Sequence, residues 1–413
     1  MLKTKMDQPN SFQPADSQSQ NQLPNQTTPM ARPEPAIKNR PPPVKIKLPN
    51  LNLKRSHDII SYLEEKLKTK VICYYTALES FIAQTHPDLF FDHLKEIGEQ
   101  ETISMVLISS GGESAASLRM ATIIREYCKN LQIIVASRCA SAATVLALSA
   151  DKIIMSPAGY LTAIDSALTH PLNPKGNGNQ PIAVSVDQVK RVLKFLREEG
   201  DVSDEKGKNE GPYRTLFRYL HPMALGEIDR YSSGSELIAR KMMKMHPGSF
   251  KDDKEIERIA KHLVNDYPLH AFPILYDEAK EIGLPVEKAD KELSNILWDL
   301  TKVCDSASKR TVTNFSPDFY HFEGFPVFIE SANKRSTHRY SYNKRFNPVT
   351  KIWQIENDNT RWVNFKPDPE GRVPFRMNEI DLPEITDTPV ETNQPIKSPL
   401  FSTNQNAPPA AGN

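Results

Sequence analysis

Short, almost continuously apolar segments alternate with helical segments in the middle of this chain, and this alternation constrains the fold more than any other feature. The apolar segments are Val71–Tyr75, Met105–Ser109 and Ile133–Ser137. The residues between them, 87–97 and 114–129, are predicted to be helices, the second with one apolar face. Strands that are apolar on both sides are typical of a sheet covered on both faces. The sequence therefore predicts an α/β fold with a buried, largely parallel sheet.

Composition divides the 413 residues into four parts. Residues 1–50 hold ten prolines and no glycine, and residues 366–413 hold nine prolines. Such segments bury too little apolar surface to offset the entropy of the chain, so both are predicted to be disordered tails. We expect residues 51–306 to form the main domain, which is rich in helices after about residue 185, and residues 307–365 to form a small β-rich appendage.

Charge and cysteine usage restrict the classes of function. The chain has 52 basic and 51 acidic residues, so its net charge favours neither nucleic acid nor a membrane surface as a partner. It has no apolar run near the roughly 20 residues of a membrane span and no secretory signal, which predicts a cytoplasmic protein. Its four cysteines lack metal-ligand or redox spacing. No phosphate-binding loop is present, and we expect neither a metal nor a cofactor.

One segment, 334–346, mixes cations with aromatic residues, as single-strand nucleic-acid binders do. It lies between the strand-like runs Val327–Ile329 and Ile352–Ile355. The preferred interpretation is a twisted β-hairpin with a solvated basic face.

Five motifs occur in a fixed order along the chain. They are Ser-Ser-Gly-Gly at 109–112, Ala-Ser-Ala-Ala-Thr at 140–144, Ala-Leu-Ser-Ala-Asp-Lys-Ile-Ile-Met at 147–155, Leu-Thr-Ala-Ile-Asp at 161–165, and Asp-Glu-Ala-Lys-Glu-Ile-Gly-Leu at 277–284. In this order they resemble the ClpP/crotonase superfamily, most closely its serine dehydrogenase proteinase branch, over about residues 56–290. The resemblance implies stacked β-β-α units that assemble into rings, here with a helical extension.

Ser141 matches the position of the nucleophile in that superfamily. Its neighbours Ala140 and Ala142 are small, which leaves room for the backbone of a substrate. The alternative reading is a serine that caps the following helix, a frequent role of serine.

Gly111 and Gly112 match the turn that forms the oxyanion hole in the superfamily. Glycines allow backbone N–H groups to face a substrate carbonyl. The N–H of Ala142 would be the second donor. Ser110 replaces the usual proline of the turn, a change that affects its rigidity, and a plain tight turn is the competing interpretation.

The resemblance leaves the general base open. In ClpP proteases a histidine follows the serine by about two dozen residues and an aspartate comes later; here Asp165 and His270 stand near these places with the residue types exchanged. Since triads are defined by geometry rather than chain order, the preferred assignment is Ser141 as nucleophile, His270 as base and Asp165 as orienting acid. Lys190 or Lys194 is the alternative base, by similarity to the signal peptide peptidase branch, and would need a pKa lowered by burial.

The sequence thus predicts a cytoplasmic, ATP-independent serine endopeptidase that acts on peptides or proteins. The alternatives are a catalytically silent ring-forming assembly or adaptor module and a crotonase-like acyl-CoA enzyme. We also expect a closed homo-oligomer that does not need the tails. Its contacts would involve an apolar stripe in the long helices of 212–265, including Leu237, Ile238, Met242 and Met245.

Overall fold

The computed structural model describes most of the chain between residues 53 and 377. The described residues are 53–165, 167–176, 181–198, 217, 219–246, 248–309, 311–366 and 376–377. The predicted tails, 1–50 and 366–413, lie outside these residues, except for Lys366 and Arg376–Met377.

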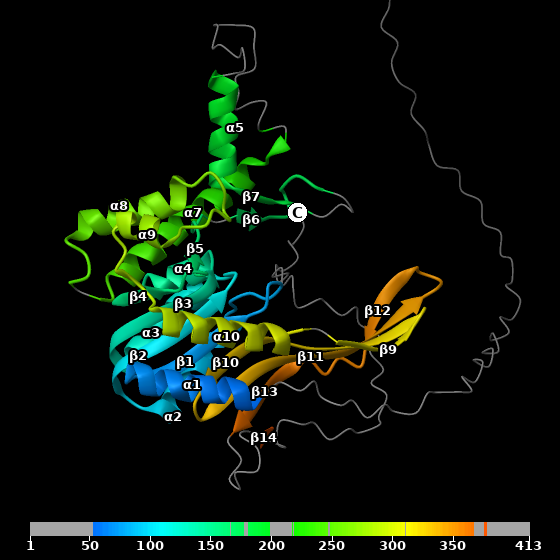
Figure 1. Ribbon diagram of the computed structural model, residues 1–413. Helices are drawn as coiled ribbons and strands as arrows, with labels where there is room; N and C mark the ends of the chain where they lie inside the picture. Colours follow the sequence, from blue (N-terminus) through cyan, green and yellow to red (C-terminus); the bar gives the residue numbers. More distant parts are fainter. Residues whose placement is uncertain are drawn as a thin grey trace, which may run out of the picture. The chain divides into compact units, whose positions relative to one another are not determined.

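Five parallel strands form the part of the central sheet that the apolar segments predict (Figure 1). In spatial order they are β1 (Lys70–Thr76), β2 (Gln100–Ser109), β3 (Cys128–Cys139), β4 (Lys152–Met155) and β8 (Val286–Lys288). A short strand, β5 (Tyr160–Leu161), also pairs with β3 in parallel. The predicted α/β class with a largely parallel core sheet is confirmed.

Helices cover both faces of this sheet. The described helices are α1 (Leu53–Leu67), α2 (His86–Ile97), α3 (Ser114–Arg125), α4 (Ala142–Ala147), α5 (Val186–Glu198), α7 (Pro222–Met243), α8 (Asp253–Asn265), α9 (Tyr276–Ile282) and α10 (Lys291–Ala307). Of these, α5 packs in a separate small cluster with α7. Apolar residues of α1 and α10 pack on one face, and those of α2, α3, α4, α7, α8 and α9 belong to the core on the other face. The strands are apolar throughout because each face of the sheet is buried.

The side chains of β1 show how one strand serves both cores. Ile72 and Tyr74 belong to the core under α2 and α3, whereas Val71, Cys73 and Tyr75 belong to the core under α1 and α10. All five are at most 1% exposed. This alternation follows from the two-residue period of a strand.

The same sheet continues beyond β1 into the C-terminal third of the chain. These strands are β9 (Thr311–Ser316), β10 (Phe319–Ser331), β11 (Lys334–Asn347), β12 (Ile352–Glu356), β13 (Arg361–Lys366) and β14 (Arg376–Met377). β10 lies antiparallel to β1, with Cys73 opposite Glu330 and Thr76 opposite Val327. The segment predicted as a β-rich appendage, 307–365, therefore does form strands, but these strands extend the central sheet. By pairing with β1, β10 satisfies the backbone N–H and C=O groups that an unpaired edge of β1 would expose.

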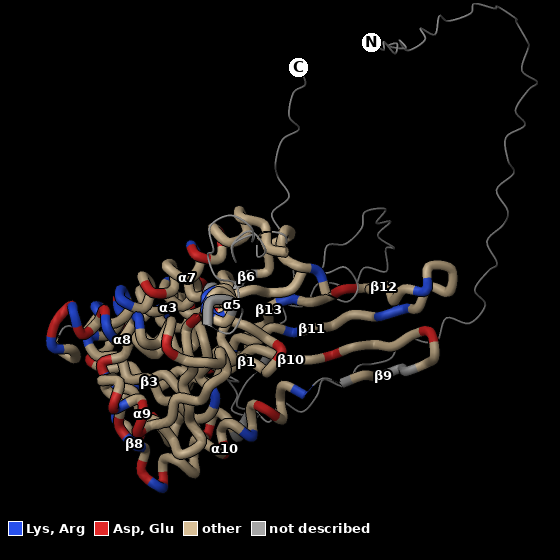
Figure 2. Tube along the Cα trace, turned by 90° about the horizontal axis from the view of Figure 1, so that it is seen from above, with Lys and Arg blue, Asp and Glu red and all other residues tan. Residues whose placement is uncertain are grey.

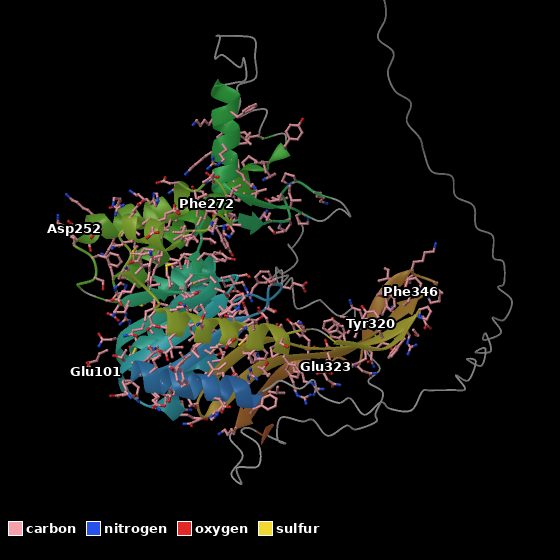
Figure 3. The ribbon with its side chains drawn as sticks, in the orientation of Figure 1. Glu101, Asp252, Phe272, Tyr320, Glu323 and Phe346 are labelled. Carbon is pink, nitrogen blue, oxygen red and sulfur yellow. The ribbon has the colours of Figure 1, made fainter. Side chains whose placement is uncertain are left out.

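The basic segment 334–346 is one of these strands, β11, which forms a hairpin with β10. The expected solvated basic face is wrong at its start: Arg335 is 0% exposed and its Nη2 lies 3.0 Å from Oε2 of Glu330. Farther along, red segments on β10 and β12 lie beside blue segments on β11 (Figure 2), so both charge signs are present there. Tyr320 and Phe346 lie on this outer part of the sheet (Figure 3).

The structure corrects one further expectation and leaves another untested. The helix predicted at 114–129 ends at Arg125, because Tyr127 turns the chain and its carbonyl accepts the N–H of Gln100. Within the apolar stripe of α7, Met242 is fully buried in the chain itself, while Leu237 is 47% exposed. Ile238 and Met245 are half-buried. The chain itself thus covers the stripe only in part, and the closed homo-oligomer stays a prediction. Among the described helices, none combines the length and apolar character that a membrane span requires.

Candidate active site

Ser141 stands between the end of β3 and the start of α4, in a backbone conformation that serine rarely adopts. Its φ is 53° and its ψ is −118°. A non-glycine residue in this region costs on the order of 1–3 kcal/mol and persists only when its surroundings hold it there. The Ser141 N–H donates to Oγ1 of Thr162 at 2.8 Å, and α4 begins with the buried Ala142 and Ala143. Its hydroxyl makes no hydrogen bond to the part of the chain that the structure describes.

The competing reading of Ser141 as a helix cap does not match this geometry. A capping serine has an extended backbone, and its oxygen accepts an N–H from the first helical turn. Ser141 occupies the cap position of α4 but makes no such side-chain hydrogen bond.

The turn formed by Gly111 and Gly112 packs directly against Ser141. A Cβ on Gly111 would lie 2.5 Å from the carbonyl oxygen of Ala140 and 2.8 Å from Cβ of Ser141. Gly111 has φ +98° and Gly112 has φ +143°, both in the region that favours glycine. Ile82 braces the turn, because its N–H donates to the Gly111 carbonyl at 2.7 Å. The glycines are required here both by backbone conformation and by space.

The backbone N–H groups near Ser141 differ in whether they are already engaged. The N–H of Gly111 donates to Oγ of Ser109 at 3.1 Å. The N–H groups of Gly112 and Ala142 have no acceptor within the described residues. Gly111 is buried whereas Gly112 is exposed. Of the three predicted oxyanion-site residues, Gly112 and Ala142 therefore have N–H groups available to a ligand.

Asp165 and His270 meet although 105 residues separate them. Nδ1 of His270 lies 2.6 Å from Oδ1 of Asp165, and the side chains are 48% and 18% exposed respectively. The hydrogen bond to Asp165 raises the pKa of His270 above its ordinary value, and partial burial opposes this shift. With Nδ1 engaged, Nε2 is the nitrogen left to exchange a proton with a partner.

Neighbouring backbone contacts hold the two segments that carry this pair. Leu161 and Ile274 exchange backbone hydrogen bonds of 3.0 and 2.9 Å, and the Ile164 N–H donates to the Leu263 carbonyl. Phe272, labelled in Figure 3, packs against Tyr267 with ring centroids 5.3 Å apart. These contacts anchor the loop between α8 and α9 that presents His270.

Thr162 connects this pair to Ser141. It accepts the Ser141 N–H and lies three residues before Asp165. Three residues span at most about 10 Å, so Asp165 lies close to the segment that supports Ser141. The described contacts include no hydrogen bond between Ser141 and His270.

The alternative bases, Lys190 and Lys194, are exposed on α5. Nζ of Lys190 donates to Oδ1 of Asn265 at 3.2 Å. α5 follows a separate two-stranded sheet of β6 (Ala167–Thr169) and β7 (Ala183–Ser185). The two lysines thus lack the burial that a lysine base needs near neutral pH.

Several hydroxyl groups around Ser141 were missed from the sequence. Thr162 accepts the Ser141 N–H, Ser109 accepts the Gly111 N–H, and the buried Ser117 donates to the carbonyl of Ala142 at 2.8 Å. The only signal in the sequence is a hydroxyl residue within an apolar run. In the described part of the chain, no group of three or more His, Cys, Asp or Glu side chains is placed to hold a metal ion.

Comparisons with known proteins give distant similarities. No family model matches the chain. A curated relative, an uncharacterized protein of Methanocaldococcus jannaschii, is 22% identical over 287 residues, which cover 70% of this chain and 85% of the relative.

Two groups of solved structures are also similar to this chain. A serine-to-alanine variant of the 1510-N membrane-bound stomatin-specific protease is 17% identical with a TM-score of 0.31, over 59% of this chain and 88% of that one. ClpP1 from Listeria monocytogenes is 15% identical with a TM-score of 0.30, over 56% of this chain and 99% of that one. At these values the similarities do not bear on activity.

Proposed function

We propose that this protein is a serine peptidase that hydrolyses peptide bonds through an acyl-enzyme on Ser141. The observation that carries the proposal is the strained backbone of Ser141, held against the Gly111–Gly112 turn with its hydroxyl unengaged among the described residues. Strained backbone of this kind clusters at functional sites. The free N–H groups of Gly112 and Ala142 and the Asp165–His270 pair supply the other parts of such a site.

In the proposed reaction, Oγ of Ser141 attacks the carbonyl carbon of the scissile bond while Nε2 of His270 accepts the hydroxyl proton. The N–H groups of Gly112 and Ala142 stabilise the negative oxygen of the tetrahedral intermediate. The C–N bond then breaks, and His270 returns the proton to the leaving amine. Water, deprotonated by His270, hydrolyses the ester on Ser141 and releases the acid product.

Asp165 orients His270 in this mechanism. Its carboxylate accepts the Nδ1 hydrogen bond, which fixes the tautomer with Nε2 free and stabilises the imidazolium that forms after proton transfer. His270 is preferred to Lys190 and Lys194 because its partner is in place, whereas both lysines are exposed.

Covalent labelling tests the nucleophile. A fluorophosphonate probe should label the full-length protein, and Ser141→Ala should lose the label and lower peptide turnover by about four to six orders of magnitude, as loss of a triad member does elsewhere. Ser149→Ala is the matched control, since Ser149 is a buried serine just beyond the other end of α4 that donates to the Leu146 carbonyl.

Two results would contradict this assignment. Labelling or peptide turnover that persists in Ser141→Ala excludes Ser141 as the nucleophile. Hydrolysis of an acyl-CoA thioester that survives Ser141→Ala, without peptide turnover in the unmodified protein, would favour the crotonase-like alternative.

A further inference from the structure

Ser109 ends β2 with a buried hydroxyl that contacts the glycine turn beside Ser141. Its Oγ accepts the Gly111 N–H at 3.1 Å and lies 2.9 Å from Oγ1 of Thr76 at the end of β1. Ser109 and Thr76 are both 0% exposed. A serine oxygen that accepts the N–H two residues later closes a small side-chain turn.

The glycine turn needs such a restraint. Glycine has more backbone freedom than any other residue type, and the turn holds two glycines, Gly111 and Gly112. Ser110 before them lacks the ring by which a proline fixes its φ angle. Ile82 holds the turn from one side, through its N–H to the Gly111 carbonyl and its carbonyl to the Glu113 N–H. Ser109 holds the turn from the other side.

A buried arginine ties the Thr76 end of this contact to the strand that carries Ser141. Nη2 of Arg138 donates to the Thr76 carbonyl at 2.5 Å, and Arg138 lies on β3, three residues before Ser141. Its guanidinium lies over the ring of Tyr75, 5.2 Å from the centroid, and its Nη1 lies 3.7 Å from Oδ1 of Asp305. The ends of β1, β2 and β3 are thereby linked by buried polar contacts.

We infer that Ser109 and Thr76 are positioning residues that fix the glycine turn, so that the Gly112 N–H faces the carbonyl oxygen bound at Ser141. This inference rests on the proposed function. By engaging the Gly111 N–H, Ser109 leaves the Gly112 N–H as the donor that the turn offers. Neither hydroxyl touches substrate; each acts through the turn.

Loss of the Ser109 hydroxyl frees the Gly111 N–H and lets the turn shift against Ser141. A displacement of about 1 Å at a reacting group can slow a reaction about a hundredfold. We expect Ser109→Ala to lower kcat about 10- to 100-fold and to change KM less than about threefold, because the Gly112 N–H acts on the developing oxyanion more than on the bound substrate. The rate of fluorophosphonate labelling should fall in parallel.

Ser104→Ala is the matched control in the full-length protein. Ser104 lies on the same strand, is 0% exposed, and its Oγ lies 2.7 Å from Oγ1 of Thr69, far along β2 from the turn. Each variant loses one buried hydroxyl group with two hydrogen-bond partners, so urea denaturation should show similar losses of stability. Only Ser109→Ala should lose kcat and labelling rate.

Thr76 gives an independent pair of variants if Ser109→Ala does not fold. Thr76→Val removes the hydroxyl at nearly constant volume and should reproduce the loss of kcat. Thr76→Ser keeps the hydroxyl and should retain most of the kcat of the unmodified protein. Equal kcat in Ser109→Ala and Ser104→Ala, or equal kcat in the two Thr76 variants, would overturn the inference while Ser141→Ala remained inactive. Activity that survives Ser141→Ala would instead refute the proposed function and, with it, this positioning role.

Discussion

Removing the buried cation Arg335 should destabilise the fold far more than removing the exposed cation Arg345 from the same strand. Arg335 and Glu330 face each other across the hairpin of β10 and β11, with 0% and 1% of their side chains exposed. Glu330 also accepts a 2.8 Å hydrogen bond from Ser56 on α1. Arg335→Met therefore leaves a buried carboxylate whose remaining hydrogen-bond partner among the described residues is the Ser56 hydroxyl.

The expected loss follows from this burial. Breaking a buried ion pair from one side costs about 3–5 kcal/mol, a large share of the roughly 5–15 kcal/mol that stabilises a typical domain. Replacing both partners, as in Glu330→Leu with Arg335→Met, should recover most of that loss. The reason is that Nε, Nη1 and Nη2 of Arg335 make no hydrogen bond to the described residues, and Nη2 contacts Glu330 only as an ion pair. Arg345→Met on the same strand is the control, because its partner Glu356 is 3.1 Å away but the two side chains are 49% and 37% exposed. Exposed pairs contribute at most about 1 kcal/mol.

Urea denaturation followed by tryptophan fluorescence measures these differences. Burial raises the pKa of Glu330, and Arg335 opposes that shift, so the pKa rises further once Arg335 is gone. A carboxyl whose pKa is raised in the folded state favours folding at low pH, and this contribution is lost as pH rises through the raised pKa. The loss in Arg335→Met should therefore be smaller at pH 5 than at pH 8. A loss equal to that of Arg345→Met at pH 8 would refute the reasoning from burial.

Two further predictions concern the candidate active site. The hydrogen bond to Asp165 raises the folded-state pKa of His270 above its ordinary value of about 6.5. That bond therefore stabilises the fold fully below the unfolded-state pKa, and its contribution is lost as pH rises through the folded-state pKa. Peptide turnover should rise over the same pH window, because His270 becomes the neutral base. Asp165→Asn should shift the rise of kcat to lower pH and should also reduce the maximal kcat. An unchanged pH–kcat profile would contradict the assignment of His270 as the base. Gly111→Ala should abolish turnover and lower stability by about 1–3 kcal/mol through strain, since its Cβ would meet Ala140 and Ser141. Gly98→Ala is the control, with φ +74° and nothing within 4 Å of the added Cβ; equal turnover in the two variants would contradict the packing of Gly111 against Ser141.

Local patterns in the sequence predict the elements of the core. The apolar runs that became β1, β2 and β3 and the helical segments that became α2 and α3 have periods set by neighbouring residues alone. The special backbone at Gly111 and Gly112 is also local, because only glycine adopts such φ angles readily. These features are visible in the sequence before any long-range contact is known.

Contacts between distant segments were decided only by the tertiary structure. Asp165 meets His270 across 105 residues, and β10 joins β1 across more than 240 residues of chain. No periodic pattern specifies such pairings, since they depend on register, on loop closure and on the burial of both faces at once. The same holds for Arg335: its sequence neighbours suggest a solvated basic strand, but the opposing Glu330 and the covering α1 place it in the core. The sequence therefore determined which residue types stand at the ends of the strands, and the packing of the sheet determined which of them meet.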